Sequence, residues 1–248
     1  VKGFLKILNK LVREMKPDLI VICWDGPGGS KKRKLINKNY KEGRKPIRLN
    51  RDVRNLSEVE EVENKIWQQT RLFEYLNKMP IVQLVADSVE ADDLVSHVGK
   101  MTKFKGWQKI IVSSDKDFFQ LLDSETILFR PVQKKILNKN RVVDSYGIHP
   151  VNFALARAIV GDKSDNLKGV RGVGLQTISK RFPFMKEENF CTIKKLVEHC
   201  ENIESNLKCY AQIIENENLI KENYELMQLY SPYIPLQTKQ KINYAVDN

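Results

Sequence analysis

Eight acidic residues in this sequence have the types and the spacing of a site for divalent metal ions. Seven stand in three short motifs, VEADDL, SSDKDF and GDKSDN, and the eighth ends an apolar run. They are Asp25, Glu90, Asp92, Asp93, Asp115, Asp117, Asp162 and Asp165. Carboxylate oxygens with almost no histidine favour hard cations such as Mg²⁺ or Mn²⁺ over zinc. Eight acids exceed the needs of one octahedral ion, so the set predicts two ions acting together on a phosphodiester.

Each motif taken alone has a simpler interpretation, because acids often cap helices and stabilise the positive end of a helix dipole. Spacing within the motifs still lets two carboxylates point in one direction. Glu90 and Asp93 share a helix face, and Asp162 and Asp165 are three residues apart. The three motifs together, beside the strand-terminal Asp25, favour the metal site over three unrelated helix caps.

The elements that position these acids follow from the hydrophobic pattern. Residues 18–25, 81–87 and 109–115 are short apolar runs without alternation, and helical patterns cover residues 56–77 and 91–103. This order predicts α/β architecture with a buried parallel sheet and helical crossovers, to which residues 126–130 add a strand. Because the carboxyl ends of parallel strands meet at one edge, the acids should converge there.

The sequence divides into an α/β core at residues 1–146 and a helical region at residues 147–248. A basic segment at residues 28–56 is inserted in the core, and a glycine hairpin, GVRGVG, occupies residues 169–174. The first residues predict an amphipathic helix already under way and no Met precedes them, so we expect the sequence to begin partway into a longer protein.

Composition is that of an ordinary globular protein, with 42% hydrophobic and 29% charged residues. No apolar run reaches the length of a bilayer span and no signal-peptide pattern is present, so we expect no membrane partner. The four cysteines form no CxxC pair, which favours reduced thiols and a cytoplasmic location.

Positive charge is concentrated in the basic segment. Residues 31–54 carry eleven Lys or Arg against two acids, which is +9 of the net charge of +11. A basic patch beside an acidic edge predicts capture of a phosphate backbone, although most charge runs are only solvated. Tyr40 within this segment has the chemistry to stack on an unpaired base.

The glycine hairpin precedes another helical pattern. Its backbone N–H groups suit a DNA phosphate and its carbonyls suit a potassium ion. A tight turn between two helices is the simpler alternative, but the neighbouring Lys168, Arg171 and Lys180 favour DNA.

These motifs together resemble the 5′ nucleases, or flap endonucleases, of bacteria and bacteriophages, which include the 5′-nuclease domain of DNA polymerase I. The matching signatures are WDG at residues 24–26, NYKEGRK at residues 39–45, VEADDL, SSDKDF, and AIVGDKSDNLKGVRGVG at residues 158–174. They follow the family's order and spacing to about residue 182, and the remainder matches only loosely.

The resemblance implies a PIN-like α/β nuclease fold, a helical arch and a helix–three-turn–helix DNA-binding region. It implies that the eight acids are metal ligands. It also implies that Lys41 stabilises the scissile phosphate electrostatically and that Arg44 is a second catalytic residue. It also places Arg157 near duplex DNA. Together with the basic segment and the hairpin, the expected DNA contacts are Tyr40, Lys41, Arg44, Lys45, Arg157, Lys168, Gly169, Arg171, Gly172, Gly174 and Lys180.

Members of this family cut a phosphodiester near the junction of a 5′ single strand with duplex, and many also degrade DNA from its 5′ end. The resemblance therefore implies a DNA substrate with a 5′ flap or end, in replication or repair. RNA primers in RNA–DNA duplexes are a further substrate of some members. We expect the protein to act as a monomer.

Two departures from the family pattern leave alternatives open. The family usually opens with a strand that ends in a metal-ligating Asp, and the match here begins after that strand. A protein that binds DNA junctions without cutting them is therefore the main alternative. Leu175 and Gln176 also replace residues that are commonly basic after the hairpin. A PIN-type ribonuclease shares the core chemistry, but the hairpin and the long basic segment argue against it.

Overall fold

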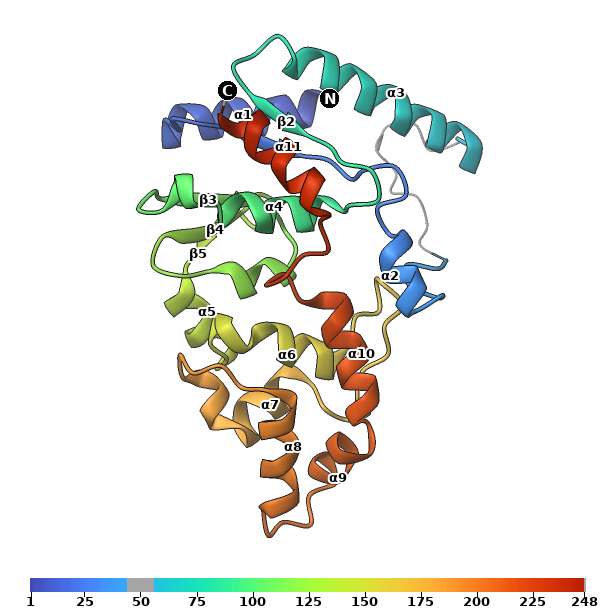
Figure 1. Cartoon of the computed structure of the whole chain (residues 1–248), viewed down its shortest axis with the longest axis vertical. Coiled ribbons are helices and arrows are strands. Elements are labelled where there is room, and N and C mark those ends of the chain that lie inside the picture. Colours follow the sequence, from blue (N-terminus) through green and yellow to red (C-terminus); the bar gives the residue numbers. More distant parts are fainter. Residues whose placement is uncertain (44–55, 248) are drawn as a thin grey trace.

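The computed structural model describes residues 1–43 and 56–247 of the chain (Figure 1). Helices and strands alternate in the amino-terminal half, as the hydrophobic pattern predicts. α1 and α3 lie at the end of the molecule that holds β1 and β2, and β3 to β5 lie closer to its middle (Figure 1). The elements of this half are α1 (Lys2–Met15), β1 (Val21–Cys23), α2 (Lys31–Ile36), α3 (Glu58–Leu76), β2 (Val82–Leu84), α4 (Ala91–Gly99), the 3₁₀ helix η1 (Thr102–Phe104), β3 (Lys109–Val112), the 3₁₀ helix η2 (Asp117–Leu121), β4 (Thr126–Arg130) and β5 (Lys135–Leu137).

Local sequence signals explain where several helices begin and end. At the start of α3, the Ser57 side chain accepts from the Glu60 amide while Glu60 reaches back to the Ser57 amide, which is a capping box. α5 (Lys139–Tyr146) ends at Gly147, which adopts the left-handed conformation with φ of 63°. α6 (Pro150–Val160) starts with a proline, at a position where the missing N–H group has no partner to lose.

The strands form two sheets instead of the single parallel sheet that the sequence predicts. β1 pairs with β2 in parallel, from Val21 opposite Val82 to Cys23 opposite Leu84. β3 pairs with β4 in parallel, and β5 adds an antiparallel edge that the pattern did not predict. In the described part of the chain no strand joins β1 to β3. Both are therefore only partly buried, where strands covered on all sides were expected.

The carboxyl-terminal half is helical, as expected, and encloses the larger hydrophobic core. α6 lies at its centre and packs against η2, α7 and α10. Phe119 of η2 is fully buried beside Phe153 of α6, so this contact joins the helical region to the α/β core. The remaining elements are α7 (Leu175–Arg181), the 3₁₀ helix η3 (Pro183–Lys186), α8 (Ile193–Asn202), α9 (Lys208–Glu215), α10 (Glu217–Met227) and α11 (Leu236–Asp247).

The last helix returns to the α/β core. Ile242 and Val246 of α11 are buried in one cluster with Leu84 of β2 and Leu94 of α4. Figure 1 shows α11 running away from the helical end, towards the end of the molecule where the amino terminus lies. α11 therefore packs in the α/β core, although it follows the expected division at residues 146 and 147 in the sequence.

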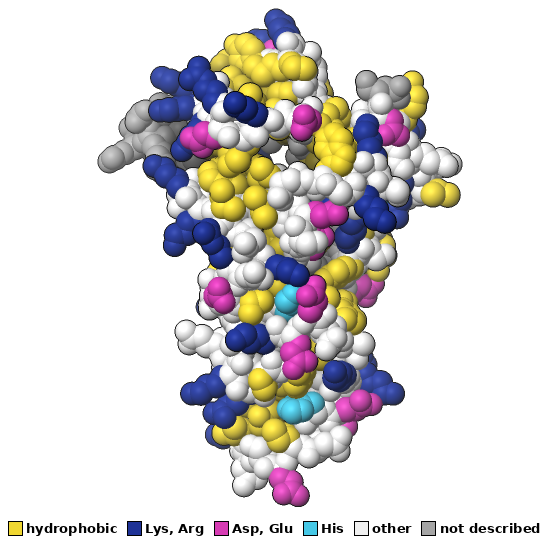
Figure 2. Space-filling model, turned by 90° about the vertical axis from the view of Figure 1, so that its left-hand side faces the viewer, with side chains coloured by type: hydrophobic (Ala, Val, Ile, Leu, Met, Phe, Trp, Pro, Cys, Tyr) yellow, Lys and Arg dark blue, Asp and Glu magenta, His cyan; other side chains and the backbone are white. Residues whose placement is uncertain are grey.

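An apolar surface lies open at the end of the molecule formed by α1 and α3. α1 is the amphipathic helix that the first residues predict, yet it buries none of its side chains. Phe4, Ile7 and Val12 are 39–42% exposed, and Trp67 of α3 is 58% exposed. Figure 2 shows apolar side chains gathered at this end. This surface is not a membrane span, since none of the described helices is long and apolar enough to cross a bilayer.

Candidate active site

The carboxyl end of β1 brings Asp25 to the start of α4. One carboxylate oxygen of Asp25 accepts a hydrogen bond of 2.9 Å from the Ala91 amide, in the first turn of that helix. The Gly26 amide donates to the Val89 carbonyl at 3.0 Å, and a Cβ atom at Gly26 would lie 1.7 Å from the Ala86 carbonyl oxygen. Only glycine permits this approach, so the WDG and VEADDL motifs are fixed against each other.

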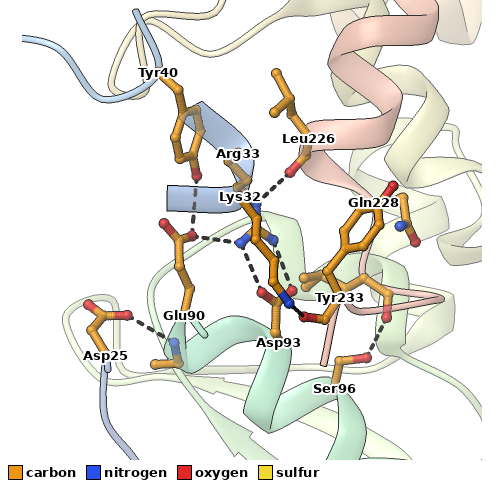
Figure 3. A network of polar contacts seen from close by, with 12 residues as sticks. Asp25, Lys32, Arg33, Tyr40, Glu90, Asp93, Ser96, Leu226, Gln228 and Tyr233 are labelled. Carbon is orange, nitrogen blue, oxygen red and sulfur yellow. Dashed lines mark hydrogen bonds and ion pairs between the residues drawn. The ribbon is translucent and has the colours of Figure 1, made fainter. Parts of the chain in front are cut away.

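Arg33, on α2, lies between two of the acids (Figure 3). Its Nη1 and Nη2 atoms donate to the two carboxylate oxygens of Asp93 at 2.9 Å each, and Nη1 also donates to Glu90 at 3.0 Å. Its Nε atom donates to the Leu226 carbonyl of α10 at 2.9 Å. None of the three charged side chains is more than 11% exposed. This buried fork holds α2, α4 and α10 together.

This ion pair changes the interpretation of Asp93. Because both of its oxygens accept hydrogen bonds from Arg33, Asp93 anchors α2 and is not free to bind a metal ion in this arrangement. The sequence did not predict the contact, since Arg33 is one of many cations in the basic segment. Both oxygens of Glu90 are also paired, one with Arg33 and the other with Lys41 at 2.9 Å, so Glu90 differs from Asp93 in that the buried guanidinium holds only one of its oxygens.

Tyr40 and Lys41 lie against the acids at the described end of the basic segment. The backbone amide of Lys41 donates to the Asp165 carbonyl at 2.9 Å. The Tyr40 hydroxyl is 3.3 Å from Glu90 and 3.4 Å from the Asp165 carboxylate, and the residue is only 3% exposed. The expectation that Tyr40 stacks on a base is therefore corrected, because its buried ring instead joins the VEADDL and GDKSDN motifs. Arg44 and Lys45 lie outside the described residues.

The turn after β3 presents Asp115 and Asp117 beside α6. The Asp117 amide donates to the Asp115 carboxylate at 2.9 Å, and η2 starts at Asp117, so the strand gives way to a helix where the spacing requires it. Arg157 donates from Nε to Asp117 at 2.8 Å and from Nη2 to Asp162. The resemblance implied a place for Arg157 near duplex DNA. Its side chain is instead 11% exposed and lies between two acids.

Burial and mutual repulsion favour the protonated form of Asp92. Burial, with the added negative charges of Asp115, Glu90 and Asp25, raises the pKa of Asp92 to about 7 against the opposing charge of Lys41. Acids from three separate motifs therefore act on one carboxyl group. This convergence is what the parallel-strand pattern predicted.

A second group of acids surrounds Arg157. Burial raises the pKa of Asp117 to about 6, because its ion pair with Arg157 offsets only part of the effect and Asp115 adds negative charge. For Asp162, burial acts in the same direction but is outweighed. Hydrogen bonds from Ser164 and the charge of Arg157 lower the pKa of Asp162. Asp115 interacts with both groups and links them.

Oxygen donors of this kind suit a hard divalent cation, yet internal cations now occupy many of them. Among residues 1–43 and 56–247, no three Asp, Glu, His or Cys side chains are arranged to hold a metal ion. Lys41 forms an ion pair with Glu90, and Arg157 forms ion pairs with Asp117 and Asp162. Raised carboxyl pKa values are typical of a cluster that lacks positive charge. At Glu90, Asp117 and Asp162, metal binding would therefore compete with these internal cations.

The glycine hairpin joins α6 to α7 next to the GDKSDN loop. Val170 and Val173 are 4% exposed and anchor the hairpin in the larger core. Lys168, Arg171 and Lys180 are exposed, as a DNA-binding role requires. The hairpin therefore presents its cations to solvent from a fixed base.

Close backbone contacts hold this hairpin in place. Gly161 has φ of 74°, and a Cβ atom there would lie 2.5 Å from the Gly169 amide nitrogen. A Cβ atom at Gly169 would lie 1.9 Å from the Val160 carbonyl oxygen. Asn223 of α10 donates to the Lys168 carbonyl at 2.8 Å, a contact that the sequence did not predict. The one feature of the sequence that could have indicated this contact is the polar Asn223 among the apolar residues of α10 that are buried.

Comparison with known proteins assigns this arrangement to a family. The family model described as the 5′-3′ exonuclease N-terminal resolvase-like domain matches residues 1–147, which is more than half of the chain. The chain belongs to this family. The resemblance drawn from the motifs is therefore confirmed, and this member of the 5′-3′ exonuclease family is an enzyme of the nuclease class.

Curated relatives agree with this assignment. The chain is 26% identical to a 5′-3′ exonuclease of Aquifex aeolicus, over 92% of its own length and 81% of that protein. It is 31% identical to a 5′-3′ exonuclease of Buchnera aphidicola subsp. Schizaphis graminum, over 83% of its length and 63% of that protein. A DNA polymerase I of Caldicellulosiruptor bescii is 25% identical over 84% of the chain, which spans only 23% of the polymerase.

Solved structures share the fold. The bacteriophage T5 D15 protein, co-crystallised with metal ions, matches with a TM-score of 0.77 at 16% identity, over 99% of this chain and 89% of that chain. A complex of the T5 D15 flap endonuclease with DNA and metal ions matches with a TM-score of 0.76 at 15% identity, over 100% and 91%. The mixed α/β fold expected for the 5′-3′ exonuclease family is thus confirmed, and the helix–three-turn–helix geometry stays a prediction.

Proposed function

We propose that the chain is a divalent-metal-dependent, structure-specific 5′ nuclease that hydrolyses DNA near junctions of a 5′ single strand with duplex. The observation that carries the proposal is the position of Lys41. This cation contacts Glu90 at 2.9 Å, at the edge where the acids of separate motifs act on Asp92. A lysine paired with one of several clustered acids can exchange that ion pair for a contact with a phosphate.

Two Mg²⁺ or Mn²⁺ ions are the proposed cofactors. The residues proposed to hold them are Asp25, Glu90, Asp92, Asp115, Asp117, Asp162 and Asp165, with Asp93 reassigned to anchoring α2. Such ions would supply a hydroxide nucleophile and stabilise negative charge on the phosphate. The raised pKa values of Asp92 and Asp117 support this, since both carboxyl groups gain from a nearby positive charge.

Lys41 has two proposed positions in the reaction. Without substrate its ammonium group neutralises Glu90. With substrate it moves to the scissile phosphate and frees a carboxylate oxygen of Glu90. Arg44 is proposed to assist from the same segment.

Replacing Lys41 by Ala should lower the single-turnover cleavage rate on the order of a hundredfold and change the Kd for DNA only a few-fold. The reason is that its charge matters most where negative charge grows on the phosphate. The matched control is Lys38→Ala, which removes an exposed cation from the same segment and should leave the cleavage rate unchanged. An unchanged rate in Lys41→Ala would remove this residue from catalysis.

The proposed DNA path runs from the basic segment across the acids to the glycine hairpin. Lys168 and Arg171, exposed on the anchored turn, and Lys180, exposed on α7, support duplex binding there. The hairpin carbonyls are a proposed potassium site. An RNA primer in an RNA–DNA duplex is a second proposed substrate, and the protein is proposed to act as a monomer.

The deciding experiment is incubation of the 248-residue chain with a labelled 5′-flap duplex, in Mg²⁺ and in chelator, with cleavage and gel shift recorded together. Cleavage near the junction that chelator abolishes is the expected result. A gel shift without cleavage in Mg²⁺ would favour the non-cutting junction binder. Affinity should fall with salt by about 0.9 log units per log[salt] for each phosphate contacted.

A further inference from the structure

A cavity of about 440 Å³ opens beside the acids of the SSDKDF and GDKSDN motifs, and Glu90 is not among its lining residues. Its lining is entirely polar and consists of Ser114, Asp115, Lys116, Arg130, Arg157, Asp162 and Ser164. Two of these, Asp115 and Asp162, are proposed metal ligands, so the cavity adjoins the reaction centre. No aromatic or aliphatic side chain is among its lining residues.

Arg130 is a cation of this cavity without a carboxylate partner in the described part of the chain. It ends β4, where its Nη2 atom donates to the Ser114 carbonyl at 2.8 Å, and its guanidinium lies 5.8 Å from the centre of the Phe119 ring. Its Nε atom and the Ser114 hydroxyl are both buried without a hydrogen-bond partner. The Arg130 side chain is thus held at the cavity by Ser114 and Phe119, while its charge has no carboxylate partner among the described residues.

Lys116 is the second cation of the cavity without a carboxylate partner in the described part of the chain. It is exposed, its Nζ atom lies 5.8 Å from the centre of the Tyr146 ring, and no carboxylate pairs with it within the described ranges. Arg157 differs, because its charge is taken up by Asp117 and Asp162. The lining holds three cations, Lys116, Arg130 and Arg157, against the two carboxylates Asp115 and Asp162, so its formal charge is positive. An anion is therefore the ligand that the cavity fits.

We propose that this cavity binds a phosphate of the cleaved strand that neighbours the scissile phosphate, with Arg130 and Lys116 as positioning residues. The inference rests on the proposed function. A polar lining without an aromatic ring suits the sugar-phosphate backbone and not a base, so the contact is independent of sequence. Its role is to fix the register of the strand over the acids.

The test uses flap duplexes that each carry one neutral methylphosphonate, at successive positions on either side of the cleavage site. Binding is measured in chelator by fluorescence anisotropy, and cleavage in Mg²⁺. For the wild-type chain, one position next to the cleavage site should raise the Kd about three- to tenfold. In Arg130→Gln the Kd for unmodified DNA should rise by a similar factor, and the same methylphosphonate should then have little further effect. The slope of log Kd against log[salt] should become shallower by about 0.9, because one phosphate contact is lost.

Lys194→Gln is the matched control, since this lysine on α8 is 86% exposed and far along the chain from the cavity. It should keep the wild-type response to every methylphosphonate. Thermal unfolding checks that Arg130→Gln is folded, and Lys116→Gln carries the same test if it is not. Equal methylphosphonate sensitivity at all positions in the wild type and both variants would overturn the inference. Failure of the wild type to cut in Mg²⁺ would instead count against the proposed function, because the binding measurement is independent of cleavage.

Discussion

Replacing Asp115 by Asn is expected to abolish cleavage, with a rate loss on the order of a thousandfold or more, while the Kd for flap DNA stays within a few-fold of wild type. Asp115 is the acid that interacts with both Asp92 and Asp117, so its charge serves both halves of the proposed metal site. An Asn side chain keeps the oxygen that accepts from the Asp117 amide, and the turn after β3 should therefore persist. Single-turnover cleavage and anisotropy binding on the same flap duplex measure the two effects.

Asp144→Asn is the control for this substitution, because Asp144 is exposed on α5 and outside the site. It should cut at the wild-type rate. Should Asp115→Asn lose binding together with cleavage, Asp115 has a structural role and the metal assignment fails. Full activity in Asp115→Asn would remove it from the ligand set.

Replacing Arg33 by Met is expected to lower the free energy of unfolding by about 3–5 kcal/mol. The substitution leaves Glu90 and Asp93 buried with no guanidinium to neutralise them, since both side chains are at most 6% exposed. It also removes the hydrogen bond to the Leu226 carbonyl that ties α10 to α2. Denaturant unfolding followed by circular dichroism gives the measurement.

Arg71→Met is the matched control, because the Arg71–Glu74 pair is about half-exposed and should contribute no more than about 1 kcal/mol. Adding Asp93→Asn to Arg33→Met should recover part of the lost stability, because one uncompensated charge is then removed. A loss below about 1 kcal/mol in Arg33→Met would show that the acids are neutralised by other means.

Sequence patterns predicted the elements, because these depend on local order, and they also predicted that acids from separate motifs lie near one another. The strand at residues 126–130 is observed at those residues, and the helical pattern at residues 56–77 is observed as α3, from Glu58 to Leu76. Short apolar runs that end in acids are typical of parallel strands, although β1 and β3 belong to separate sheets in the described part of the chain.

What the sequence did not predict depends on pairings between distant residues. Arg33 and Asp93 are 60 residues apart, and nothing local distinguishes Arg33 from the cations around it. Arg157 follows the periodicity of α6 and gives no sign that it lies between Asp117 and Asp162. The interruption between β1 and β3 is equally non-local, since a run of apolar residues shows that a strand forms but not which neighbours it has.

The return of α11 to the α/β core ties folding to the order of synthesis. Val246 closes a cluster around Leu94, whose codon is translated about 150 residues earlier. A nascent chain on the ribosome can therefore form its first strands and helices before α11, which completes this hydrophobic cluster, has been synthesised. The surface of β2 and α4 around Leu84 and Leu94 lacks this cover until α11 is synthesised, and transiently exposed apolar surface of this kind favours aggregation.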